Sequence, residues 1–114
     1  MSRDWAQKIR DVKEYIDTHI CDISNIYEIS DMFHIQVNQL YSWFRVLFQT
    51  TPKEYLLDKK IEELTKILRS EGDGHVIFYY AYKLGFETES ALCHLIKRKT
   101  NLTFTEFARK VLRN

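Results

Sequence analysis

The side chains best suited to specific chemistry lie on one face of the stretch from residue 36 to about residue 49. Residues three and four apart share a face of a helix, and here that face presents Asn38, Tyr41, Ser42 and Arg45. It offers hydrogen-bond donors and acceptors and is nearly free of carboxylates, which fits a helix that lies along DNA. Any solvated helix face could have the same composition, so at this point both interpretations stay open.

The sequence shows no arrangement typical of an enzyme or a metal site. No group of His, Asp, Glu and Cys residues has catalytic or ligand spacing. Cys93 adjoins His94, but no further ligand converges on this pair, and Cys21 and Cys93 form no CxxC motif. We therefore predict a protein that is not an enzyme, with no catalytic residue, no metal and no cofactor, and with both thiols reduced.

Helical spacing of apolar residues predicts the elements that position the polar face. The first twenty residues are expected to form an amphipathic helix, whose apolar stripe runs to Ile16 and Ile20. A short helix is expected over residues 26–33 and another over 36–49. In the latter, Leu40 lies opposite the polar face and points toward the core.

The second half of the chain has a similar order of elements. A long helix is predicted over residues 52–70, followed by a glycine-containing loop and a short helix over 76–84. Gly85 marks a turn that needs a positive φ, and a helix over 88–100 follows it. The last helix is expected to bury Phe107, Val111 and Leu112.

Two motifs of the form T-x-x-E begin helices and reveal an internal repeat. Thr51–Glu54 and Thr103–Glu106 each combine an N-cap hydroxyl with a glutamate that can bond back to the cap. They lie 52 residues apart, and Leu40 and Leu92 are separated by the same interval. Matching capping boxes after matching helix pairs predict two helix-turn-helix units joined by one long helix.

Composition also favours an all-helical fold. The chain of 114 residues has only three Gly and one Pro, which leaves little material for hairpin turns. No apolar run approaches the roughly 18 residues that a membrane span needs, and no signal peptide is recognisable, so we expect no membrane association. The net charge is only +1, but residues 75–114 carry seven Lys/Arg against three Asp/Glu, a local net of +4 (7 − 3).

With these motifs in place, the sequence resembles the DNA-binding domain of the AraC/XylS family of bacterial transcription regulators. The resemblance extends from about Ile9 to Ala108. Its most specific motif is Ala81-x-x-x-Gly85-Phe86-x-x-x-x-x-Leu92, to which the first unit adds Leu40-x-x-x-Phe44 and Thr51-Pro52-x-x-Tyr55-Leu56.

What the resemblance implies is a stand-alone, all-α regulator in the bacterial cytoplasm, associated with the nucleoid. It would be a monomer that inserts two recognition helices into successive major grooves of double-stranded DNA. The implied helix-turn-helix subdomains are residues 1–50 and 72–114, joined by a linker helix over 51–71, with about seven helices in all. The linker stretch over 52–70 would span roughly 28 Å, comparable with the groove repeat of about 34 Å. The resemblance favours an activator that contacts RNA polymerase over a repressor.

The resemblance also implies roles for individual residues. Base-facing positions would be Asn38, Tyr41 and Ser42 in the first recognition helix and Ser90 and His94 in the second, with Glu89 beside them. Contacts to the DNA backbone would come from Arg45, Lys97, Gln39 and Lys99. Tyr41 is expected to be exposed. The run at residues 97–99 can also be interpreted as a solvated, basic helix end that complements the helix dipole.

Several positions depart from the family pattern. Ser42 and His94 stand where the family tends to have arginine, and His34 replaces the glycine of the first turn. Gln49 and Asn101 replace the usual glycine before each capping box. The low net charge and the two missing arginines favour an alternative function: a protein-interaction module or antagonist on the same scaffold, with weak DNA affinity.

Overall fold

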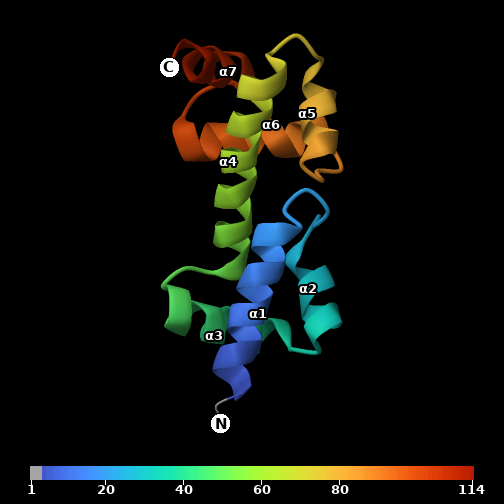
Figure 1. The fold of residues 1–114 in the computed structure, drawn as a ribbon, viewed down its shortest axis with the longest axis vertical. Helices are drawn as coiled ribbons and strands as arrows, with labels where there is room; N and C mark the ends of the chain where they lie inside the picture. The colour runs from blue at the N-terminus through green and yellow to red at the C-terminus, as the bar shows by residue number, and fades with distance from the viewer. Residues whose placement is uncertain (1–3) are drawn as a thin grey trace. The chain divides into compact units, whose positions relative to one another are not determined.

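A computed structural model describes residues 4–114, and the regular structure in this range is entirely helical (Figure 1). The helices are α1 (Asp4–Thr18), α2 (Ile26–Phe33), α3 (Val37–Phe48), α4 (Pro52–Glu71), α5 (Ile77–Lys83), α6 (Glu89–Thr100) and α7 (Phe104–Arg113). This order confirms the all-α class with two helix-turn-helix motifs. The chain divides into two compact units, and the division falls inside α4: unit 1 ends at Lys59 and unit 2 begins at Lys60.

The core of unit 1 forms where α1 packs on the inner side of α3. Ile9, Val12 and Ile16 lie on one stripe of α1 and are fully buried. They share a hydrophobic cluster with Leu40 and Phe44 of α3, which are fully buried as well. Because this apolar stripe of α3 is held against α1, the opposite face of α3 is left to solvent.

A tight turn connects α2 to α3 in unit 1. Asn25 caps α2 by accepting the backbone N–H of Glu28, and the helix ends at His34 in the left-handed region, with φ 56°. The backbone N–H of Ile35 donates to the carbonyl of Ser30 at 3.0 Å, and the Ser30 hydroxyl donates to the carbonyl of Ile35. His34 therefore adopts the left-handed conformation that glycine adopts most readily.

The core of unit 2 is built from the second part of α4 and the three helices that follow. Leu64 and Leu68 of α4 are fully buried, as are Tyr80 of α5 and Ile96 of α6. Phe104, the first residue of α7, packs against Tyr80 with 5.2 Å between ring centroids. As in unit 1, burial of one stripe of the second helix of the motif leaves its other face exposed.

The turn between α5 and α6 repeats the backbone bond seen in unit 1. Gly85 adopts φ 83°, as its place in the sequence predicts, and the N–H of Phe86 donates to the carbonyl of Ala81 at 2.9 Å. The connection between the two helices has five residues here, 84–88, and three in unit 1, 34–36. Its last residue, Thr88, caps α6 by accepting the N–H of Ala91.

The repeat extends further toward the N-terminus than the sequence motifs alone reveal. The buried residues Val12 and Ile16 of α1 correspond, at the same interval of 52 residues, to the buried Leu64 and Leu68 of α4. The second part of α4 therefore supports unit 2 as α1 supports unit 1. Each unit therefore contains a supporting helix followed by a helix-turn-helix motif.

The ends of α3 and α6 also match. Both helices have 12 residues, and both stop at a left-handed residue, Gln49 with φ 59° and Asn101 with φ 63°. Thr103 and Glu106 then form the complete capping box predicted for α7, and the N–H and hydroxyl of Thr103 lower the pKa of the Glu106 carboxyl. At α4, the Thr51 hydroxyl accepts the N–H of Glu54 at 3.1 Å.

Two expectations about these helices are wrong. Leu112 is 41% exposed rather than inward, because α7 buries the narrower stripe of Phe107, Ala108 and Val111. The first helix ends at Thr18, so Ile20 lies beyond it; residues 1–3 of that expected helix are outside the described range.

None of the helices within residues 4–114 combines the length and apolar character needed to cross a bilayer.

Candidate nucleic-acid interface

The exposed face of α3 brings together most of the residues proposed for the first recognition helix. Asn38, Ser42 and Arg45 are all exposed and lie at helical spacings of three and four residues. The buried Leu40 and Phe44 fix the rotation of α3 and thereby point these polar side chains outward. The face contains amide, hydroxyl and guanidinium groups, which can donate to base edges or phosphates.

Tyr41 differs from its expected exposure. Its side chain is half-buried and packs against the unit 1 core. Burial raises the pKa of the Tyr41 phenol, and nearby Tyr27 and Glu54 raise it further. The residue can therefore offer an edge of its ring to a partner, but it is held in place by its neighbours.

Gln39 lies apart from the other α3 residues. Its position is about 100° around the helix from Asn38. It borders a shallow hollow beside the first turn together with Lys8, His34 and Trp43. Gln39 is thus placed toward the edge of the polar face.

On α6 the structure brings Ser90, His94 and Lys97 onto one exposed side. These residues follow one another at steps of four and three, and all three are exposed. The side is continuous with the start of α7, because His94 and Lys97 line the same shallow hollow as Thr103 and Thr105. Hydroxyl, imidazole and ammonium groups therefore gather on one surface of unit 2.

Two other residues proposed on α6 do not share that side. Lys99 is half-buried and lies roughly half a turn around the helix from Ser90. Glu89 occupies the first turn of α6, about 100° from Ser90, where its carboxylate complements the N-terminal dipole. The Lys97 ammonium donates to the carbonyl of Asn101 at 3.2 Å, so it also caps the end of its own helix.

Cys93 lies beside this surface without the features of a reactive thiol. It is half-buried, and desolvation raises the pKa of its thiol, with a smaller contribution from Glu89. A raised pKa lowers the fraction of nucleophilic thiolate at neutral pH. Residues 4–114 contain no cluster of three His, Cys, Asp or Glu side chains that could hold a metal ion.

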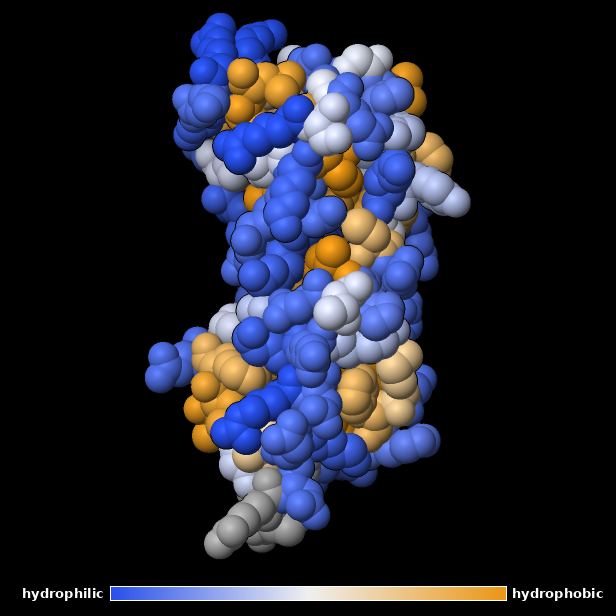
Figure 2. All heavy atoms as spheres, viewed as in Figure 1, coloured by the Kyte–Doolittle hydropathy of each residue, from blue (hydrophilic) through white to orange (hydrophobic). Residues whose placement is uncertain are grey.

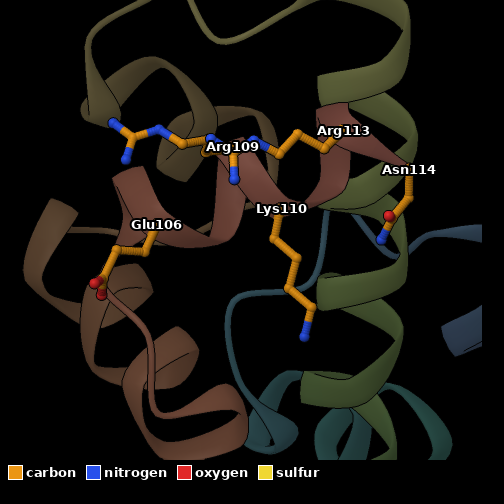
Figure 3. Close-up of a pocket in the computed structure, with 5 residues that line it drawn as sticks. All are labelled: Glu106, Arg109, Lys110, Arg113 and Asn114. Atoms are coloured by element: carbon orange, nitrogen blue, oxygen red, sulfur yellow. The ribbon is translucent and has the colours of Figure 1, made fainter.

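A basic surface on α7 was not among the predicted site residues. Arg109, Lys110 and Arg113 project from α7 around a shallow hollow that Glu106 and Asn114 complete (Figure 3). Helical spacing alone does not distinguish a binding surface from a solvated one at such positions. Their concentration on one short helix accounts for part of the positive charge of the C-terminal third.

The exposed apolar side chains include two aromatic rings on α5. The face shown in Figure 2 is dominated by hydrophilic residues, with small separate apolar areas. On α5, Tyr80 is buried and Tyr79 half-buried, whereas Tyr82 is 71% exposed and lies 6.4 Å from the ring of Phe78.

Two short-helix, tight-turn, helix motifs with exposed polar second helices define a helix-turn-helix DNA-binding protein. Residues 29–110 match a family model described as a helix-turn-helix domain. The match covers well over half of the chain, and the chain belongs to this family, the AraC type of helix-turn-helix regulator. The protein is accordingly a DNA-binding transcription regulator.

A solved structure shares the fold. The C-terminal domain of AraT, a response regulator from Geobacillus stearothermophilus, is similar with a TM-score of 0.78 over 90% of this chain and 84% of that chain. The sequence identity is 14%, so the likeness concerns the fold alone. A search of curated proteins found no match to the sequence.

Proposed function

We propose that the chain binds specific DNA sequences by inserting α3 and α6 into successive major grooves. The observation that carries this proposal is the matched pair of 12-residue helices, each preceded by a tight turn and each exposing a polar side. The 20 residues of α4 make a rod of about 30 Å, comparable with the groove repeat of about 34 Å. This length supports the spacing that two adjacent grooves require.

The two recognition helices would have different roles. On α3, Asn38 can form a bidentate pair with adenine, Ser42 can bond to several bases, and Arg45 can contact phosphate. On α6, Ser90 and His94 would face bases, Lys97 would contact the backbone, and Glu89 would lie at the margin. Lys99, on the opposite side of α6, would contribute its charge only. Because α3 contributes one cation and α6 three, unit 2 would provide most of the phosphate attraction.

The regulator would act as a monomer in the cytoplasm, where its DNA target lies, and would activate transcription by contacting RNA polymerase. Support for activation comes from the family resemblance. Support for a monomer comes from the presence of two DNA-reading motifs in one chain, because a protein with a single motif needs a second copy to read two grooves.

A salt series on random duplex DNA tests the electrostatic part of this proposal. Lys97→Ala combined with Arg98→Ala should weaken binding to every duplex and reduce the slope of log K against log salt by roughly two, because each lost phosphate contact removes about 0.9 from the slope. The control is Lys66→Ala combined with Arg69→Ala, which removes two exposed charges from α4 in the same unit. An unchanged slope in the first variant would contradict the proposal.

Binding to genomic fragments separates the proposal from its alternative. A preference of the wild-type chain for particular fragments supports sequence-specific binding. Micromolar or weaker affinity with no preferred fragment would instead favour the interaction module, for which Ser42 and His94 in place of arginines and the net charge of +1 are the supporting features.

A further inference from the structure

Unit 2 contains a buried cation that the DNA-binding surfaces do not use. Lys60 is 1% exposed, although lysine is almost never fully buried unless it has a partner. Its ammonium donates to the backbone carbonyl of Leu84, and its Nζ lies 5.3 Å from the centroid of the Phe86 ring. Both partners belong to the turn between α5 and α6.

The contacts of Lys60 engage both ends of this turn. Leu84 is the C-cap of α5, where carbonyl oxygens lack helical partners and the helix dipole favours a cation. Phe86 lies just before α6, with its N–H bonded back to Ala81, and its ring offers a cation–π contact to the ammonium. Gly85, between them, has the positive φ of the turn. The side chain of a supporting helix thus holds the segment from which α6 starts.

We propose that Lys60 is a positioning residue for DNA recognition by unit 2. By fixing the Leu84–Phe86 turn from the α4 side, its ammonium sets the direction in which α6 leaves the turn, and hence where Ser90 and His94 face. The role rests on the proposed function, because it matters only if α6 reads DNA.

The corresponding residue of unit 1 does not make the contact that Lys60 makes with the turn of unit 2. Lys8 lies 52 residues before Lys60, on α1, and is exposed beside the His34–Ile35 turn. In unit 1 the buried polar contact at the turn comes from within the motif, where the Ser30 hydroxyl bonds to the carbonyl of Ile35. In unit 2 the equivalent backbone bond ends on the carbonyl of Ala81, and this residue has no hydroxyl. Loss of the Lys60 ammonium should therefore affect the DNA segment read by α6 and spare the segment read by α3.

Lys60→Met provides the main test, because methionine keeps an unbranched stem of similar length while removing the charge and the donor. Replacing a buried charge with an apolar side chain can leave stability unchanged, so the decisive measurement is binding. The probe is a genomic fragment retained by the wild-type chain. Affinity is measured by titration, and hydroxyl-radical footprinting reports the protection of each of the two DNA segments. Circular dichroism checks that the helices remain formed.

The matched control is Lys66→Met, which removes the same charge from the same helix at a side chain that is 76% exposed. Lys60→Met should bind about tenfold more weakly than Lys66→Met, a difference of about 1.4 kcal/mol, and should lose protection at one DNA segment only. Lys60→Arg, which keeps a cationic donor, should restore much of that protection. Phe86→Leu should reduce protection of the same DNA segment. This variant tests the role of Lys60 if Lys60→Met does not fold.

Two results would overturn the role of Lys60 while leaving the proposed function intact. One is equal affinity and full protection in folded Lys60→Met and Lys66→Met. The other is an equal loss of protection at both segments, which would indicate a general effect on the fold. If the wild-type chain itself shows no salt-dependent binding to DNA, the proposed function fails first, so the two failures are distinguishable.

Discussion

Asn38 is the residue from which sequence preference can be tested most directly. It is exposed near the start of α3, where residues of a recognition helix meet base edges, and its amide can bond to both N6 and N7 of adenine. Asn38→Ala should weaken binding to the preferred fragment by about 1–3 kcal/mol and relax the preference at one base pair. Titration against a set of single-base variants of that fragment measures both effects.

Gln39 is the natural comparison for Asn38. It is exposed on the same turn of α3 but faces the edge of the polar surface. Gln39→Ala should reduce affinity to a similar extent on all base variants, as expected of a backbone contact. If both substitutions change affinity without changing the base preference, α3 does not read sequence through Asn38.

At the scale of the element, three helices end at a non-glycine residue whose backbone lies in the left-handed region. This conformation strains a residue that has a Cβ by roughly 1–2 kcal/mol. Gln49, at the end of α3, has φ 59°. Gln49→Gly should raise the free energy of unfolding by up to about 1 kcal/mol, because the relief of strain exceeds the added entropy of the unfolded chain. Urea titration measures the change.

Gln49→Ala separates relief of strain from the loss of the glutamine side chain, because alanine keeps the Cβ that causes the strain. It should not increase the free energy of unfolding. Asn101→Gly, at the equivalent end of α6, should give a smaller gain than Gln49→Gly, since asparagine tolerates this conformation better than glutamine. Equal gains from glycine and alanine at position 49 would show that strain is not the cause.

The same elements show what the sequence could and could not predict. The starts of α4 and α7 were predictable because a threonine cap followed by a glutamate is a local signal, and the αL turn at Gly85 was predictable because only glycine has that freedom. The half-burial of Tyr41 and the burial of Lys60 were not. Each depends on side chains from other helices. The periodicity along one helix does not reveal which residues of other helices approach it.

At the scale of the whole molecule, the duplicated architecture gives each unit its own hydrophobic core. The buried cluster of unit 1 includes Phe44, that of unit 2 includes Ile96, and the two clusters have no buried residue in common. The aromatic composition provides separate probes. The chain has two tryptophans, Trp5 and Trp43, and both lie in unit 1 with 5.7 Å between their rings. Tryptophan fluorescence therefore reports unit 1, whereas circular dichroism reports all the helices.

Ile96→Ala should show whether the two cores unfold separately. Ile96 is fully buried in the unit 2 cluster, so its truncation should destabilise that unit by about 2–5 kcal/mol. We expect the circular dichroism transition in urea to broaden and begin at lower concentration, while the midpoint of the tryptophan transition stays close to that of the wild type. Ile16→Ala, at a fully buried position of unit 1, should instead move the tryptophan midpoint. If Ile96→Ala shifts both probes to one common lower midpoint, the chain unfolds as a single cooperative structure, and the independence of the two cores is refuted.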